Sequence, residues 1–144
     1  MTIWHTRPTL ESLLAESRDT MMAHLGIEYL EVGDDYLRGR MPVDHRTLQP
    51  MGLLHGGASL VLAETVGSVA ANHCVDRARS RCVGLEINAN HTRSAKSGWV
   101  IGTARPAHLG RTTQVWEIRI EDDSGRLVCL SRLTMAIVPV PQPG

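Results

Sequence analysis

The chain has 144 residues, of which 42% are hydrophobic, so it is long and apolar enough to form one domain with its own core. Its formal net charge of +0 argues against nucleic acid as the main partner, because phosphate binding normally requires a basic excess. Three cysteines lie in apolar surroundings without a CxxC pair. They indicate reduced thiols in a cytoplasmic protein rather than a disulfide framework: Cys74, Cys82 and Cys129.

The first third of the chain predicts a helix followed by two strands. Apolar residues recur at roughly helical spacing over residues 9–25, and Thr9 is suited to cap the helix that they predict. Residues 27–32 and 36–41 are strand-like and flank a Gly-Asp-Asp turn. Residues 42–54 have no clear period and contain two prolines and a glycine, so we expect a loop there.

The remaining two-thirds predicts one long apolar helix and then only strands. The helix begins after His55 and ends near residues 74–76. Alternating or apolar segments predict four strands, over residues 83–90, 99–105, 116–121 and 127–138. We expect the proline-rich tail, residues 139–144, to be frayed.

Strands joined by short turns predict an antiparallel sheet, and therefore an α+β fold within a single domain of residues 1–144. The long helix is apolar on nearly all sides, so it must also be covered on nearly all sides. One curved sheet covers only part of it, and a second copy of the chain is the natural cover for the rest. The helix is too short to cross a membrane, and it carries Glu64.

Glu64 is the most informative residue of the chain, because no other acidic or basic residue lies between His55 and Asp76. A carboxylate among Leu, Val and Ala is expected to be desolvated, which costs stability unless a partner or a function justifies it. The helix also opens with His55-Gly56-Gly57, which suits a helix N-terminus with bare N–H groups. A lone acid and a helix N-terminus together can polarise and attack a carbonyl group.

The spacing of these two features predicts how they meet. Gly56 and Glu64 are eight residues apart, which is about 12 Å along one helix. One carbonyl group cannot touch both. If both act on one substrate, they come from different chains, as they would where two antiparallel helices meet at a twofold axis. This arrangement gives two equivalent sites per dimer.

Several segments together resemble the hotdog-fold acyl-CoA thioesterases. The resemblance is carried by residues 49–58 (QPMGLLHGGA) and 63–70 (AETVGSVA), and it continues through residues 83–91, 106–110 and 114–116. It is nearest to the thioesterases of 1,4-dihydroxy-2-naphthoyl-CoA and their proofreading relatives in enterobactin synthesis. It implies a hotdog fold, in which an antiparallel sheet wraps around one central helix. It also implies homodimers that often pair into homotetramers.

The resemblance also implies the roles of individual residues. The Gly56 N–H would polarise the thioester carbonyl, and Glu64 of the partner chain would act as nucleophile or as general base, two roles that the sequence does not separate. Gln49 and His55 would orient the reacting groups, and Ser68 could bond the attacking water. The residues implied in substrate binding are Val69, Gly84, His91, Arg93, Ser94, His108 and Arg111, with Lys96 in the same basic set. An ordinary solvated face is the alternative reading of that set.

The expected activity is therefore hydrolysis of acyl-CoA thioesters, and the expected acyl groups are aromatic, of the benzoyl or 1,4-dihydroxy-2-naphthoyl type. A thioester on an acyl carrier protein is the alternative substrate. Two other functions remain open at this point: a hotdog dehydratase or hydratase, and a non-catalytic acyl-CoA-binding module. No HExxH or paired CxxC spacing is present, so we expect neither a metal site nor a cofactor.

Overall fold

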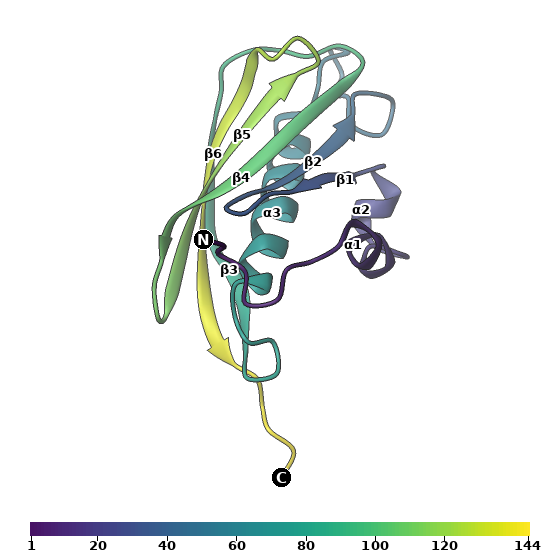
Figure 1. Ribbon diagram of the computed structural model, residues 1–144. Helices are drawn as coiled ribbons and strands as arrows, with labels where there is room; N and C mark the ends of the chain where they lie inside the picture. The colour runs from purple at the N-terminus through teal and green to yellow at the C-terminus, as the bar shows by residue number, and fades with distance from the viewer.

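A computed structural model describes residues 1–144 and contains one six-stranded antiparallel sheet curved around a long helix, α3 (Gly56–His73) (Figure 1). The strand order in the sheet is β1-β2-β4-β5-β6-β3. This arrangement confirms the predicted α+β hotdog fold. The strands are β1 (Glu28–Val32), β2 (Leu37–Pro42), β3 (Ser80–His91), β4 (Trp99–Leu109), β5 (Thr113–Asp122) and β6 (Leu127–Pro139).

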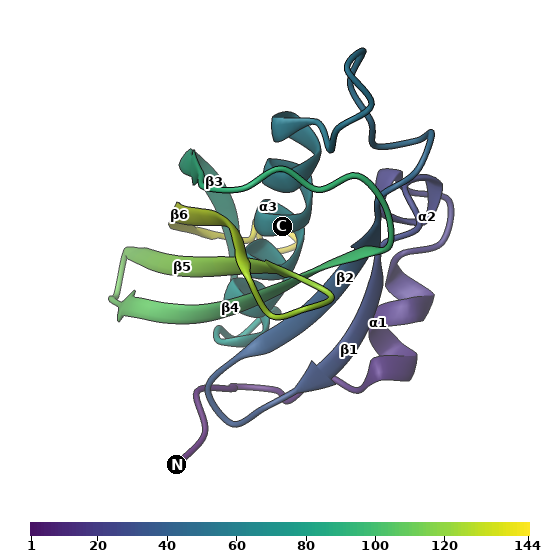
Figure 2. The same cartoon turned by 90° about the horizontal axis from the view of Figure 1, so that it is seen from above.

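The concave face of the sheet buries one side of α3. Leu62, Val66 and Ala70 are fully buried on that side, against an inner sheet face that includes the fully buried Ile118 and Leu133. Gly67 lets the helix come close, because a Cβ at this position would lie 2.8 Å from a methyl carbon of Leu133. Figure 2 shows α3 crossing one face of the sheet, with the N-terminal helices beside β1.

The N-terminal helical region is two short helices rather than the one predicted over residues 9–25. They are α1 (Leu10–Glu16) and α2 (Met21–His24). Thr9 caps α1 as predicted, in a capping box with Ser12. The break occurs because Asp19 adopts a left-handed conformation, with φ of 57°, which an α-helix cannot accommodate. After this interruption, the two methionines of α2 line a groove together with residues of α3.

Strand β3 forms one edge of the sheet and departs from its predicted alternation. A β-bulge shifts the register between Gly84 and Glu86. As a result Cys82 and Gly84 face the helix, whereas Val83 and Leu85 are 41% and 62% exposed. The alternation holds after the bulge, where Ile87 packs against the core. The edge strand therefore presents apolar side chains and unpaired backbone groups to its surroundings.

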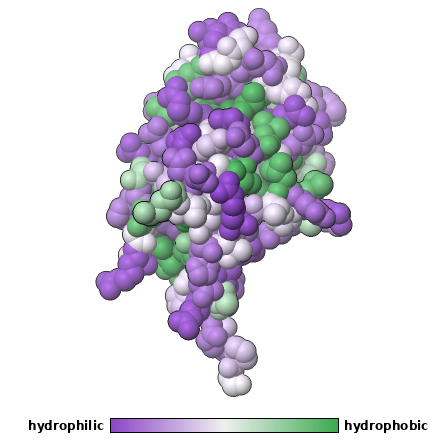
Figure 3. Space-filling model, viewed as in Figure 1, coloured by the Kyte–Doolittle hydropathy of each residue, from purple (hydrophilic) through white to green (hydrophobic).

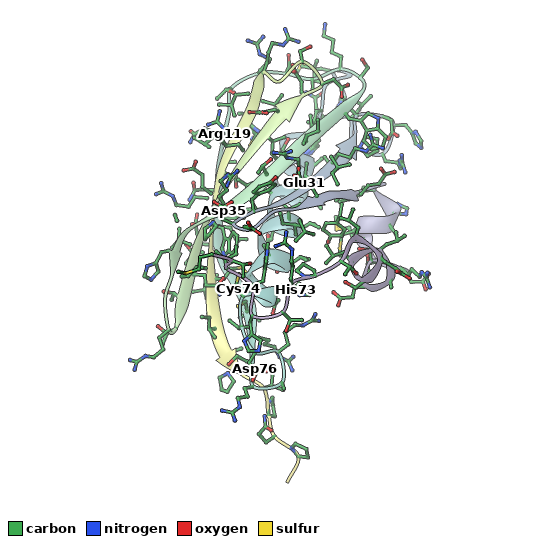
Figure 4. The ribbon with its side chains drawn as sticks, in the orientation of Figure 1. Glu31, Asp35, His73, Cys74, Asp76 and Arg119 are labelled. Atoms are coloured by element: carbon green, nitrogen blue, oxygen red, sulfur yellow. The ribbon has the colours of Figure 1, made fainter.

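The C-terminal end of α3 is held by the first residues of the chain. The N–H groups of His5 and Thr6 donate to the His73 carbonyl at 2.9 and 3.2 Å, and His73 Nδ1 lies 3.1 Å from the Thr6 carbonyl. Burial lowers the pKa of His73 and raises that of the neighbouring Cys74 to about 12, so imidazole and thiol are both uncharged at neutral pH. Figure 4 shows this pair at the lower end of the helix.

The three cysteines are free, as predicted. Cys82 and Cys129 are buried and Cys74 is half-buried. The tail is attached further along than predicted: Pro139 belongs to β6, and the Val140 N–H donates to the Arg79 carbonyl at 2.9 Å. No helix is both long enough and apolar enough to span a membrane.

Candidate active site

The N-terminus of α3 leaves one backbone donor free. The His55 side chain caps the helix, with Nδ1 accepting the Gly57 N–H at 2.8 Å. The His55 N–H donates to the Thr47 carbonyl at 2.8 Å, and the Ala58 N–H donates to the His55 carbonyl at 3.0 Å. Of the four N–H groups that an α-helix leaves without intrahelical partners, only that of Gly56 has no acceptor within the chain. A donor at a helix N-terminus carries positive potential and is suited to a developing negative charge.

This donor opens into a hollow of about 380 Å³ at one end of the sheet. Five residues predicted from the sequence line this hollow. They come from the loop before α3, from the start of α3, and from the end of β3 and the residues after it: Gln49, Gly56, His91, Arg93 and Ser94. The wall also contains Leu53, Leu54, Ser59, Thr92 and Val128, which the sequence had not singled out.

Two side chains of this hollow are held in place. The Gln49 carbonyl oxygen accepts the Met51 N–H, which leaves the amide NH₂ group of Gln49 as a donor. The His91 ring lies directly against Gly56, where an added Cβ would be 2.9 Å from His91 Nε2. Glycine at position 56 therefore leaves room for the imidazole beside the free N–H.

A second, basic hollow of about 420 Å³ adjoins the first and shares Arg93 and Ser94 with it. Its lining contains three basic and two acidic side chains. Arg93 and Lys96 form no ion pair within the chain, Arg126 is paired with Asp122 at 2.9 Å, and Asp123 accepts the Trp99 N–H at 3.1 Å. Two unpaired cations next to serine hydroxyls can bind phosphate groups through charge-assisted hydrogen bonds.

Glu64 is exposed in the single chain, so this chain alone does not provide the desolvation that was predicted for its carboxylate. The physical reason is that the sheet covers one side of α3 and leaves the side of Glu64 open. The carboxylate lies against the edge strand, where a Cβ at Gly84 would be 2.6 Å from Glu64 Oε1. Gly84 therefore leaves space for this side chain. Glu64 forms no ion pair within the chain.

Glu64 lines a groove of about 320 Å³, which we call the α2–α3 groove; its residues are Met21, Met22, Val61, Glu64, Thr65, Ser68 and Val69. Ser68 and Val69 thus lie beside Glu64, as the helical spacing indicated. The Ser68 hydroxyl makes no hydrogen bond within the chain, so it is available to a water molecule or a ligand.

His108 and Arg111 lie elsewhere, so the prediction of one local basic set is wrong for them within a single chain. They belong to the turn between β4 and β5, where Thr113 pairs with Ala136 of β6. His91 pairs with Cys129, seven residues away along the same strand, or roughly 23 Å at strand spacing. Both groups are recognisably basic in the sequence, but their placement at opposite ends of the sheet depends on strand register.

Sequence reasoning also missed residues that shape the site. Met21 and Met22 enter the α2–α3 groove because the chain turns at Asp19, a feature with no periodic signal. Asn72 fastens the edge strand to the helix: its amide donates to the carbonyls of Ser68 and Cys82 and accepts the Cys82 N–H at 2.8 Å. An amide within so apolar a helix is a signal that could have been noticed.

An antiparallel sheet wrapped around one long helix is the fold of the hotdog thioesterases. The sequence profile of the thioesterase superfamily matches residues 51–129, and the chain belongs to this family. The chain is 54% identical over 136 residues to the 1,4-dihydroxy-2-naphthoyl-CoA hydrolase of Escherichia coli K12, covering 94% of this chain and 99% of that protein.

Solved structures of two other proteins are also similar. One is a mutant thioesterase from Pseudomonas aeruginosa with a glutamine replaced by alanine, with a TM-score of 0.95, 51% identity, and coverage of 96% of this chain and 100% of that chain. The other is a Staphylococcus aureus protein, known in one form with a glutamate replaced by alanine (TM-score 0.81) and in another with a glutamine replaced (TM-score 0.80). It is 38% identical, over 83% of this chain and at least 98% of that one.

Proposed function

We propose that the protein hydrolyses aryl-CoA thioesters at two sites of a homodimer, each combining Gly56 of one chain with Glu64 of the other. One observation carries the proposal: the free Gly56 N–H and the unpaired Glu64 carboxylate lie eight residues apart on one helix, about 12 Å, and each faces an open hollow. Within one chain neither group has a partner for the chemistry that it suits.

The exposed edge of the sheet supports a twofold partner. Antiparallel pairing of β3 with its copy would continue the sheet and satisfy the backbone groups of the edge. It would also set the two α3 helices antiparallel, which brings the N-terminus of one toward Glu64 of the other. Such dimers could pair further into tetramers.

In this arrangement the Gly56 N–H stabilises the oxyanion that develops on the thioester carbonyl. In one path Glu64 attacks the carbonyl carbon, the thiolate of CoA departs, and water then hydrolyses the resulting anhydride to release the acid and restore the carboxylate. In the other path Glu64 removes a proton from a water molecule that attacks the carbonyl carbon, and the thiolate of CoA departs. Gln49 and His55 orient the thioester, and the Ser68 hydroxyl bonds the attacking water. Both roles of Glu64 are compatible with its position in an open groove.

The basic hollow is suited to the phosphates of CoA, with Arg93, Ser94 and Lys96 as ligands. Antiparallel pairing would also place the partner's β4–β5 turn, which carries His108 and Arg111, at the same end of the joined sheet as Gly56. A twofold partner would thus reduce the separation of the two basic groups that is seen in one chain.

The similar proteins support the substrate class and the two residues. The E. coli relative is named for an aryl-CoA substrate, 1,4-dihydroxy-2-naphthoyl-CoA. In the S. aureus protein the substituted glutamine and glutamate are fifteen positions apart, and Gln49 and Glu64 have the same separation here. We place the reaction in the cytoplasm, where the three free thiols would stay reduced.

The test is release of free thiol from acetyl-, benzoyl-, 2-naphthoyl- and dodecanoyl-CoA. We expect kcat/KM for the aryl esters to exceed that for acetyl-CoA by about tenfold or more, because an apolar groove adds binding energy for each buried carbon. The same measurement with these acyl groups attached to an acyl carrier protein shows whether the enzyme prefers CoA thioesters or carrier-protein thioesters.

Other results would contradict the proposal. A higher kcat/KM for acetyl-CoA than for the aryl esters would exclude a site specialised for aryl groups. Conversion of crotonyl-CoA without thiol release would indicate a hydratase, and tight binding of CoA esters without turnover of any would indicate a binding module.

A further inference from the structure

The α2–α3 groove contains two methionines that neither the fold nor the reaction explains. Met22 packs partly against the core, whereas Met21 is 59% exposed. Both side chains face the same groove as Glu64. Together with Val61 and Val69, the two methionines form a continuous apolar lining beside the proposed catalytic acid, and a contiguous exposed apolar patch is typical of a binding site.

If the protein has the proposed function, the occupant of the groove is the acyl group of the substrate, because the groove contains Glu64. A thioester whose carbonyl carbon is reached by Glu64 must extend its acyl group into the surroundings of that carboxylate. Glu64 is the one charged residue of the groove, and the others carry apolar or hydroxyl side chains. The groove is therefore suited to an uncharged apolar group and unsuited to the nucleotide of CoA, for which the basic hollow lies at the end of α3.

The extent of the groove favours a compact group over a long chain. From Glu64 to Val69 the helix rises about 7.5 Å, comparable with the length of two fused aromatic rings. Beyond Val69 the next hollow, of about 140 Å³, is lined by polar side chains that include Glu16 and Arg77. These two form an ion pair at 3.1 Å, which an unsubstituted alkyl chain would have to desolvate.

Methionine side chains are also well suited to contact the aromatic ring of an acyl group in this groove. The chain has no phenylalanine, so stacking of aromatic rings is limited. Thioether sulfur makes favourable contacts with aromatic rings, and the unbranched side chain adapts to rings of different shape. The turn at Asp19 brings these side chains to the groove.

We propose that Met21 and Met22 form the wall of the acyl site and determine its preference for bulky aryl groups. The inference rests on the proposed function, but it assigns acyl specificity to α2 rather than to the residues of α3 alone. Met21 is the better residue to test, because it is more exposed than Met22 and contributes less to the core.

In the experiment, kcat/KM for 2-naphthoyl-CoA and acetyl-CoA is measured for the wild type, Met21→Ala and Met21→Leu. We expect Met21→Ala to lower the value for naphthoyl-CoA roughly 5- to 30-fold and that for acetyl-CoA less than about twofold. Met21→Leu should recover most of the loss. Leu14→Ala is the matched control, because it shortens another exposed apolar residue, 64% exposed, that lies outside the groove.

Three results would overturn the inference. They are an equal loss for both esters, no loss for either, and a change of oligomeric state in Met21→Ala by light scattering, which would assign Met21 to a subunit interface. Each is separable from failure of the proposed function, because that failure would already appear as absent or Glu64-independent turnover of aryl-CoA by the wild type.

Discussion

Glu64→Gln is expected to lower the rate of thioester hydrolysis roughly 10³-fold while leaving the protein folded. The amide keeps the size of the carboxylate but neither attacks the carbonyl nor accepts a proton from water. Glu64 is exposed and forms no ion pair within the chain, so its replacement removes no contact on which the fold of that chain depends. The measurements are thiol release, binding of an aryl-CoA ester and the unfolding midpoint.

The control for this substitution is Glu11→Gln, which removes an exposed carboxylate from α1 without touching the groove. Its activity should equal that of the wild type. Near-wild-type hydrolysis by Glu64→Gln would show that another group performs the reaction. Loss of folding together with activity would instead indicate that Glu64 has a structural role, for example in an interface between chains.

Gly56→Pro is expected to lower kcat about 10²- to 10³-fold, the usual effect of removing one oxyanion donor. Gly56 is the first residue of α3, a position where proline fits and where its missing N–H costs the helix nothing. The preceding His55 has φ of −66° and ψ of 130°, the extended conformation that a following proline requires. The substitution therefore removes the donor and leaves the helix intact.

The matched control is Gly56→Ala, because both variants place a Cβ against the His91 ring and only proline lacks the N–H. We expect alanine to retain substantially more activity than proline. Equal losses in the two variants would attribute the effect to displacement of His91, and the Gly56 N–H would then have no part in the reaction.

Local patterns predicted most of the fold, because they report on the side chains that face the sheet. The alternation of β5 and the apolar helix were read correctly for this reason. The failures occurred where a backbone irregularity changes the pattern without changing composition. Asp19 divides the N-terminal helix, and the bulge at Gly84 turns Val83 and Leu85 outward.

The site was predictable in its parts but not in its assembly. His55, Gly56 and Glu64 stand out in the sequence because of their type and spacing, and the helix presents them as expected. The burial of Glu64 was predicted from its apolar neighbours in sequence, whereas exposure depends on what covers that side of α3 in space. His108 and Arg111 were misplaced for the same reason, since position along a strand pair depends on register.

Each proposed site combines residues of two chains, and complementation between inactive variants tests this arrangement. Glu64→Gln and Gly56→Pro chains carrying different tags are co-expressed, and the mixed dimers are isolated by both tags. In a shared site, Gly56 of the first chain meets Glu64 of the second, so one of the two sites is intact. We predict about half of the wild-type activity per dimer. Mixed dimers as inactive as either parent would contradict the account, because they would place Gly56 and Glu64 in the same site of a single chain.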